Sequence, residues 1–301
     1  MITAERKDRK ARKDICFFAA LAAFAFFVWL GCAFQHTTRL VQVSPARYAA
    51  RMPDVDVNGL QLHYEDRGAG DPLLLLHGGT GIGADWQLVF TSGDPHGFRV
   101  VVPDLRGHGR STNPSGTFTF RQCATDMFAL LDRLGIERTK AIGLSAGAKT
   151  LLHMATAQPD RVEAMVLVSA TPYFPAPARA AMAQLTVESF SDAEWATHRQ
   201  RHVRGDDQIR MLFEQMRGLK DSHDDMAFTP PLLGTITART LIVHGDRDPL
   251  YPVELALEIY RSIPGSSLWV VPNGGHGPIF GGQAAAFVDV AMDYLSGSPR
   301  A

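Results

Sequence analysis

The sequence predicts an α/β protein in which a mostly parallel β-sheet carries helices on both faces. From residue 54 to near the C-terminus, short apolar runs of strand length alternate with stretches whose apolar residues recur at helical spacing. Several runs are apolar throughout, such as "PLLLLHGG" at 72–79, which is typical of strands buried on both faces. Strands that alternate with helices favour parallel pairing, because each helix returns the chain to the starting edge of the sheet.

The first predicted element is a β-hairpin in "DVDVNGLQLHYED" at 54–66. Apolar and polar residues alternate on both sides of Asn58-Gly59, and this dipeptide is a strong signal for a two-residue hairpin turn. Further strands are predicted, in chain order, at 72–79, 98–104, 140–145, 162–170, 238–246 and 266–274. With the two hairpin strands these make an eight-stranded sheet.

Helices are predicted between these strands. "FRQCATDMFALLDRLG" at 120–135 has apolar residues at helical spacing and ends in Gly135, a common helix stop. Other helices are expected at 146–159, 252–263 and 284–297. Residues 171–237 break the alternation: they begin with the proline-rich "TPYFPAP" and contain no convincing strand. This segment is too long for an ordinary connection and is predicted to be a helical cap over one end of the sheet.

The N-terminal part has a different composition. A basic head at 1–14 with six Lys or Arg precedes "ICFFAALAAFAFFVWLGCAF" at 15–34, a run without a charged residue. About 20 apolar residues are enough to cross a bilayer as a helix, so an uncleaved transmembrane anchor is the preferred interpretation. A lipoprotein signal ending at Cys32 and a cleaved secretory signal are the alternatives, although Trp29 fits the lipoprotein pattern poorly. Residues 35–53 are read as a tether.

All three interpretations put residues 54–297 on the extracytoplasmic side, because the basic head stays in the cytoplasm. The six basic and three acidic residues of the head come from totals of 30 and 31, so the body that remains is mildly acidic. Such a body has no basic surface for nucleic acid, and that class of partner is excluded. Of the three cysteines, Cys123 is alone in the body, so no disulfide within it is expected.

Reactive side chains collect at the C-terminal ends of the predicted strands. Ser145 ends the run at 140–145, Asp246 and Asp248 lie at the end of the run at 238–246, and His276 follows the last run. In an open parallel sheet these ends meet at one edge, so a nucleophile, an acid and an imidazole are expected there together.

Five motifs in order resemble the α/β-hydrolase superfamily: "HGGTG", "DLRGHGRS", "GLSAG", "HGDRDP" and "GGHGP". The resemblance covers 54–297 and implies an α/β-hydrolase fold, with a capped, mostly parallel eight-stranded sheet. It implies Ser145 as nucleophile on a sharp turn, with Gly143 and Gly147 relieving the crowding around it. His276 is implied as the general base and Asp248 as the triad acid, with Asp246 as the competing carboxylate.

The same resemblance implies an oxyanion hole formed by the backbone amides of Gly79 and Ala146. It implies structural roles for His77 and His108 and assigns Asp104 to holding its own loop. No metal and no organic cofactor are expected, because no Cys/His cluster with ligand spacing and no dinucleotide glycine motif occurs in the sequence.

These features predict a serine hydrolase that acts on a small-molecule substrate through an acyl-enzyme, most simply on a carboxylic ester. Carbon–carbon bond hydrolases, lactonases, amidases, aminopeptidases and perhydrolases use the same triad and stay as alternatives. Discrimination among them is expected in the cap, where Met182, Trp195, Met211, Phe213 and Met216 either line an acyl site or pack the helices. A membrane-tethered binding protein without activity is the alternative outside enzymes.

Overall fold

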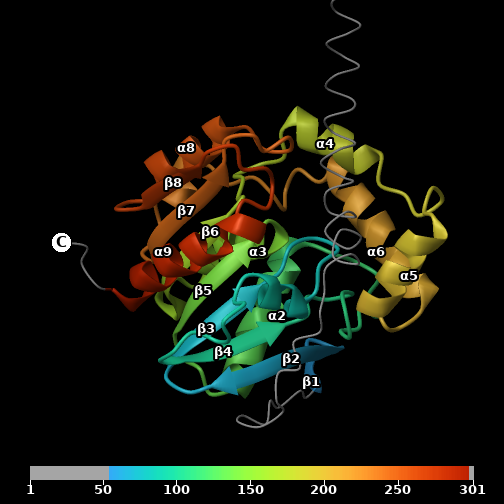
Figure 1. The fold of residues 1–301 in the computed structure, drawn as a ribbon, viewed down its shortest axis with the longest axis horizontal. Helices are drawn as coiled ribbons and strands as arrows, with labels where there is room; N and C mark the ends of the chain where they lie inside the picture. Colours follow the sequence, from blue (N-terminus) through green and yellow to red (C-terminus); the bar gives the residue numbers. More distant parts are fainter. Residues whose placement is uncertain (1–53, 298–301) are drawn as a thin grey trace, which may run out of the picture.

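The computed structural model describes residues 54–297, which form a single sheet of eight strands with helices on both sides (Figure 1). The strands are β1 (Asp54–Val57), β2 (Leu60–Gly68), β3 (Asp71–Leu76), β4 (Phe98–Pro103), β5 (Thr139–Leu144), β6 (Val162–Val168), β7 (Arg239–Gly245) and β8 (Ser267–Val271). Their order across the sheet is β1-β2-β4-β3-β5-β6-β7-β8. The prediction of a mostly parallel eight-stranded sheet is therefore confirmed.

Only the first two strands are antiparallel to their neighbours, and every pair from β4 to β8 is parallel. The predicted hairpin joins β1 and β2 at Asn58 and Gly59, whose φ values of 48° and 77° are both positive, as a tight hairpin turn requires. Some strands end earlier than the apolar runs suggested. The run at 72–79 leaves the sheet after Leu76, because the chain turns at His77-Gly78-Gly79.

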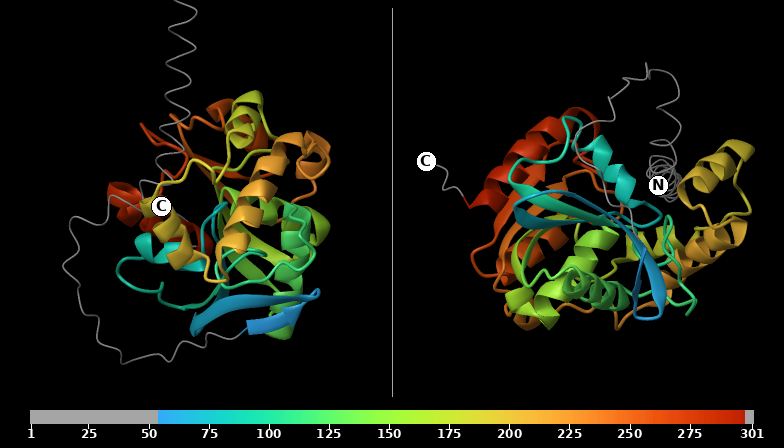
Figure 2. Two further views of the ribbon diagram at one scale, coloured as in Figure 1. Left: turned by 90° about the vertical axis from the view of Figure 1, so that its right-hand side faces the viewer. Right: turned by 90° about the horizontal axis from the view of Figure 1, so that it is seen from below.

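Two apolar layers cover the sheet. On one face pack α2 (Phe120–Arg133), α3 (Ala146–Ala157) and α8 (Val253–Ser262), whose buried side chains belong to one continuous core. On the other face the short 3-10 helix η2 (Gly83–Leu88) and α9 (Ala284–Ser296) form a second core around Trp86 and Phe287. The strands run between these layers, as the views from the side show (Figure 2).

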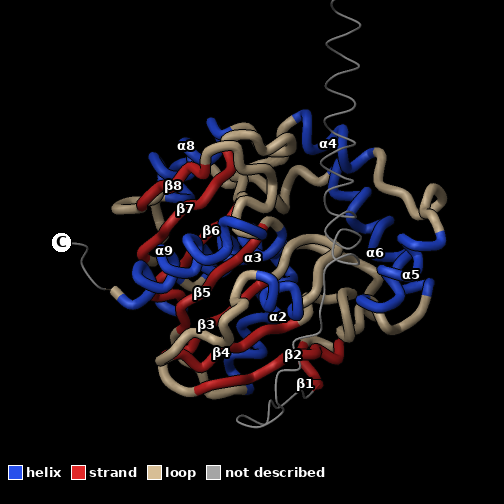
Figure 3. Tube along the Cα trace, in the orientation of Figure 1, coloured by secondary structure: helices blue, strands red, loops and turns tan. Residues whose placement is uncertain are grey.

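The chain between β6 and β7 is helical and contains α4 (Ala176–Ala183), α5 (Asp192–Arg201), α6 (Asp206–Gly218), η4 (Leu219–Asp221) and α7 (Pro230–Leu233). The helices α4, α5 and α6 lie together on one side of the molecule; residues 184–191 connect α4 to α5, and a short turn at 202–205 connects α5 to α6 (Figure 3). Helix α5 starts at a capping box in which Ser191 and Glu194 exchange hydrogen bonds. Helix α6 buries Ile209, Leu212, Phe213 and Met216 on its inner side.

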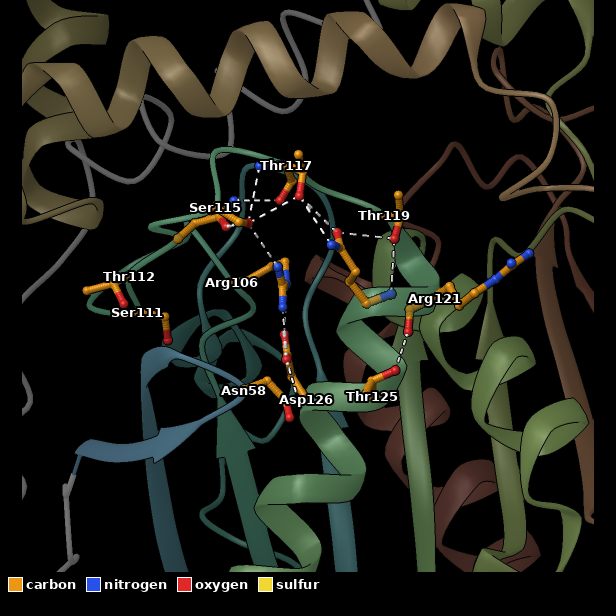
Figure 4. Close-up of polar contacts among 12 residues, drawn as sticks. Asn58, Arg106, Ser111, Thr112, Ser115, Thr117, Thr119, Arg121, Thr125 and Asp126 are labelled. Atoms are coloured by element: carbon orange, nitrogen blue, oxygen red, sulfur yellow. Dashed lines mark hydrogen bonds and ion pairs between the residues drawn. The ribbon is translucent and has the colours of Figure 1, made fainter.

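A buried ion pair fixes the loop after β4 to helix α2 (Figure 4). Arg106 donates two hydrogen bonds to Asp126, of 2.8 and 2.9 Å, and the carboxylate is fully buried. Asn58 of the hairpin turn donates to the same carboxylate at 2.9 Å. One carboxylate thus joins the hairpin, the "DLRGHGRS" loop and α2.

The basic head, the apolar run at 15–34 and the tether at 35–53 lie outside the described residues, so their predicted roles stay predictions. Within 54–297, no helix combines the length and the apolar character that crossing a bilayer would need.

Candidate active site

Ser145 occupies the sharp turn between β5 and α3. Its backbone has φ 49° and ψ −100°, a strained conformation for a residue with a side chain. Glycines make this turn possible: a Cβ on Gly147 would lie 2.2 Å from the carbonyl oxygen of Leu76, and one on Gly143 would lie 2.5 Å from the carbonyl carbon of Gly147. The side chain of Ser145 therefore projects at the C-terminal end of the sheet because its neighbours have none.

The structure brings Ser145, His276 and Asp248 together from three different strand ends. His276 Nε2 lies 2.9 Å from Ser145 Oγ, and His276 Nδ1 lies 2.7 Å from Asp248 Oδ2. All three side chains are buried, with Ser145 8% exposed. This is the geometry in which an imidazole can accept the hydroxyl proton while a carboxylate holds its ring.

Asp248 is held by its own loop. Its Oδ1 accepts hydrogen bonds from the amides of Leu250 and Tyr251, at 2.8 and 3.1 Å. Burial raises the pKa of this carboxyl, but the charge and hydrogen bond of His276 outweigh it, so the pKa of Asp248 is lowered overall. The competing Asp246 is exposed, and its carboxylate is 4.0 Å from Arg247. The geometry thus separates two carboxylates that the sequence left in competition.

The loop after β3 is connected to the Ser145 turn by a hydrogen bond of 3.0 Å from the amide of Gly147 to the carbonyl of His77. Gly79 on this loop and Ala146 at the start of α3 both line the same cavity as Ser145. The amide of Ala146 is in the first turn of a helix, where an N–H group has no acceptor within the helix. The two amides of the predicted oxyanion hole are therefore on neighbouring segments of the cavity wall.

Histidines near this loop serve as hydrogen-bond partners of the backbone. His77 Nε2 accepts from the amide of Leu105 at 2.9 Å, and His108 Nε2 accepts from the amide of Thr80 at 3.2 Å. Burial lowers the pKa of His77 to about 4 and that of His108 to about 3, so both are neutral at pH 7. Asp104 accepts hydrogen bonds from two backbone amides of adjacent loops.

A cavity of about 190 Å³ opens beside Ser145 between the sheet and the cap. Of the cap residues considered from the sequence, Met182, Phe213 and Met216 contribute to its wall. Trp195 instead packs against Phe190 within the cap. The wall is mainly apolar, which suits the acyl or alkyl part of a substrate.

Two neighbours of Ser145 were not found from the sequence. Tyr251 lines the same cavity as Ser145, and burial raises the pKa of its hydroxyl, which keeps the hydroxyl protonated. Lys149 Nζ lies 3.4 Å from Ser145 Oγ, although Lys149 is only 2% exposed. The signal for Lys149 was its spacing, because residues four apart on a helix lie on the same face. Among residues 54–297, no cluster of three His, Cys, Asp or Glu side chains is arranged to hold a metal.

This fold and this site define an α/β hydrolase. The model of the family described as alpha/beta hydrolase fold matches residues 71–191, and one described as TAP-like protein matches 223–299. The chain belongs to the α/β-hydrolase superfamily, and it is a hydrolase of that class.

Among its relatives is 2-hydroxy-6-oxononadienedioate/2-hydroxy-6-oxononatrienedioate hydrolase 2 of Pseudomonas putida, 30% identical over 86% of this chain and 99% of the relative. Serine hydrolase BPHL of Homo sapiens is 30% identical over 74% of this chain and 79% of its own. The solved structure of 2-hydroxy-6-oxo-6-phenylhexa-2,4-dienoate hydrolase from Rhodococcus sp. superposes with a TM-score of 0.69 at 18% identity, covering 83% of this chain and all of that one.

Proposed function

We propose that this protein is a serine hydrolase in which Ser145 attacks a carbonyl carbon and His276 moves the protons. The observation that carries this proposal is the continuous chain of hydrogen bonds from Asp248 through His276 to Ser145 at the wall of an apolar cavity. Asp248 would orient the imidazole and stabilise it when it becomes charged, without itself taking a proton.

The steps follow from this geometry. His276 takes the Ser145 proton as the serine oxygen bonds to the carbonyl carbon, and the carbonyl oxygen gains the charge. The amides of Gly79 and Ala146 would bind that oxyanion, aided by the positive end of the α3 dipole. When the tetrahedral intermediate collapses, His276 gives its proton to the leaving group. Water then attacks the acyl-enzyme by the same route, which releases the acid and restores Ser145.

For the bond that breaks, a carbon–carbon bond beside a ketone is the first candidate. The P. putida relative, matched over 99% of its length, is named for a 6-oxo dienedioate. Such a compound has no ester, so its hydrolysis breaks the bond between the ketone carbon and its neighbour. The leaving carbon needs a conjugated carbonyl to take up its electron pair, and His276 then supplies the proton.

Carboxylic ester hydrolysis, the prediction made from the sequence, is the second candidate. The contact of 2.9 Å between His276 Nε2 and Ser145 Oγ favours it, because a leaving alkoxide departs beside the same nitrogen and can take its proton directly. An ester needs no electron sink in the leaving group. The two candidates therefore differ in what the substrate must contain, whereas the triad is the same.

The test is the intact mass of the full-length protein after treatment with a small fluorophosphonate, with Ser145→Ala as the control. One adduct on the wild type and none on the variant is expected. No adduct on folded wild-type protein would contradict the proposal. Wild-type enzyme that has not been treated with the fluorophosphonate would then be offered a vinylogous 1,5-diketone and the ester of the same acyl group. Faster cleavage of the diketone supports the first candidate, and cleavage of the ester alone supports the second.

We propose, from the sequence, that the apolar run at 15–34 holds this enzyme at a membrane with residues 54–297 on the extracytoplasmic side. Retention in the membrane pellet after alkaline carbonate extraction, with digestion of the body by protease added from outside, is expected. Loss of retention in a Cys32→Ser variant would instead support the lipoprotein interpretation.

A further inference from the structure

Lys149 is in an unfavourable place for a cation. It lies in the first turn of α3, where the positive end of the helix dipole disfavours positive charge. It is 2% exposed, so it has lost nearly all of its contact with water. Among the ion pairs of residues 54–297 there is none that involves Lys149. A buried amine in such a position costs stability, and strongly perturbed ionisable groups of this kind cluster at functional sites.

Aromatic rings surround the ammonium group and hold it in place. Its Nζ lies 4.7 Å from the ring centre of Tyr251, 5.4 Å from that of Phe120 and 5.7 Å from that of Phe174. Ring faces stabilise a desolvated cation, but they accept hydrogen bonds poorly. The three rings come from three different segments of the chain, so the amine is fixed by the tertiary structure and not by its own helix.

The hydrogen-bonding capacity of Lys149 is mostly unused. An ammonium group has three N–H donors. Lys149 has one hydrogen bond from Nζ, to Ser145 Oγ, and at 3.4 Å it is long. Lys149 is part of the cavity wall, beside Ser145 and Tyr251. The remaining donors are therefore available to a molecule in the cavity.

The other cation of the cavity wall differs in this respect. Arg201 of the cap also lines the cavity, but it donates to Asp85 at 2.6 Å, so its charge is already paired. An anionic group that enters the cavity would thus find, at Lys149, a positive charge that is not in an ion pair. This charge lies next to the nucleophile.

We propose that Lys149 is a specificity-determining residue that binds a negatively charged oxygen of the substrate, a carboxylate or an enolate, close to the carbonyl that Ser145 attacks. With Nζ 3.4 Å from the nucleophilic oxygen, a hydrogen-bonded oxyanion lies about two to four bonds from the reacting carbon. The substrate class is then keto acids and half-esters of short diacids, not neutral esters. This assignment rests on the proposed function for the identity of the attacked carbonyl, but the anion site itself does not.

The test compares two ligands of the same shape, 4-oxopentanoate and its neutral isostere hexane-2,5-dione. Dissociation constants for full-length wild type, Lys149→Met, Lys149→Gln and Arg201→Gln are measured by ligand-observed NMR. Wild type is expected to bind the anion about 10- to 100-fold more tightly than the dione, the range for a charge-assisted hydrogen bond. The Met variant should lose this preference, the Gln variant most of it, and Arg201→Gln should keep it.

An equal affinity for both ligands in the wild type would overturn the proposal. So would a preference that survives in both Lys149 variants, or one that only Arg201→Gln removes. The fluorophosphonate reaction separates this result from the proposed function. If wild-type protein does not react with the fluorophosphonate but still prefers the anion, the serine mechanism is refuted and the anion site is not. If the Lys149 variants lose labelling but keep the preference, the lysine positions the serine and does not bind substrate.

Discussion

Replacing Lys149 with methionine should make the protein more stable, by an amount that depends on pH. Burial lowers the pKa of Lys149 from 10.5 to about 7, and the charge of Asp248 only partly opposes this. One pKa unit corresponds to about 1.4 kcal/mol, so the protonated amine costs the folded state up to about 5 kcal/mol. Relaxation of the surroundings and the cation–π contacts reduce this, and we expect a gain of about 2–4 kcal/mol.

The direction of the pH dependence follows from proton binding. Below pH 7 Lys149 is charged in both the folded and the unfolded chain, and the whole cost is present. Between pH 7 and 10.5 unfolding takes up a proton, so this contribution to stability improves as the pH rises. The advantage of Lys149→Met should therefore be largest at pH 6, shrink through pH 8–9 and nearly vanish at pH 10.5.

The assay is reversible urea unfolding of wild type, Lys149→Met and Lys149→Gln at pH 6, 8 and 10. Tyr251, which contacts the amine, and Asp248, whose charge acts on it, are present in all three proteins, as is His276 beside Ser145, so differences between proteins isolate Lys149. The Gln variant keeps polar atoms in the site and should gain less. A difference in free energy of unfolding that is constant from pH 6 to 10, or a Met variant less stable at pH 6, would refute the reasoning.

Three further predictions concern the site and the loop behind it. Asp248→Asn should lower the rate of nucleophile labelling by about 10³- to 10⁴-fold, whereas Asp246→Asn, the exposed control, should change it less than threefold; equal effects would contradict the geometry. Gly147→Ala puts a Cβ 2.2 Å from a β3 carbonyl oxygen, so labelling should be lost or the protein should not fold, and unchanged labelling would count against the turn described. Asp126→Asn leaves Arg106 without its buried counter-charge and should cost about 3–5 kcal/mol in urea unfolding, with a loss under 1 kcal/mol arguing against the pair.

Much of this site could be predicted because the topology of a parallel sheet converts order along the chain into proximity in space. Ser145 and His276 are separated by 131 positions, yet each follows a strand that ends at the same edge. The glycines beside Ser145 were informative for a different reason. Only a residue without a side chain allows α3 to approach β3 so closely.

Other features depend on contacts that no local pattern encodes. The spacing of Asp246 and Asp248 does not separate them, and only the family resemblance favoured Asp248. In the structure they differ because the amides of Leu250 and Tyr251 fold back onto the Asp248 carboxylate. The cap residues that line the cavity could not be identified from the sequence either. Met216 and Trp195 are both apolar residues on helices, and only the packing of α5 and α6 determines that Met216 faces the cavity. Side-chain direction in such a cap is a property of the assembled helices.

Lys149 shows why a functional residue can be missed although its position is visible in the sequence. A lysine four residues after the nucleophile is on the correct helix face, but an exposed lysine there would be ordinary. Its meaning comes from the rings of Phe120, Phe174 and Tyr251, which remove water from it and come from elsewhere in the chain. The same desolvation lowers stability and strengthens the attraction for an anion, since both effects scale with the loss of water around the charge. A gain of stability and a loss of anion preference should therefore appear together in each Lys149 variant, and a variant showing only one of them would separate two effects that we attribute to a single cause.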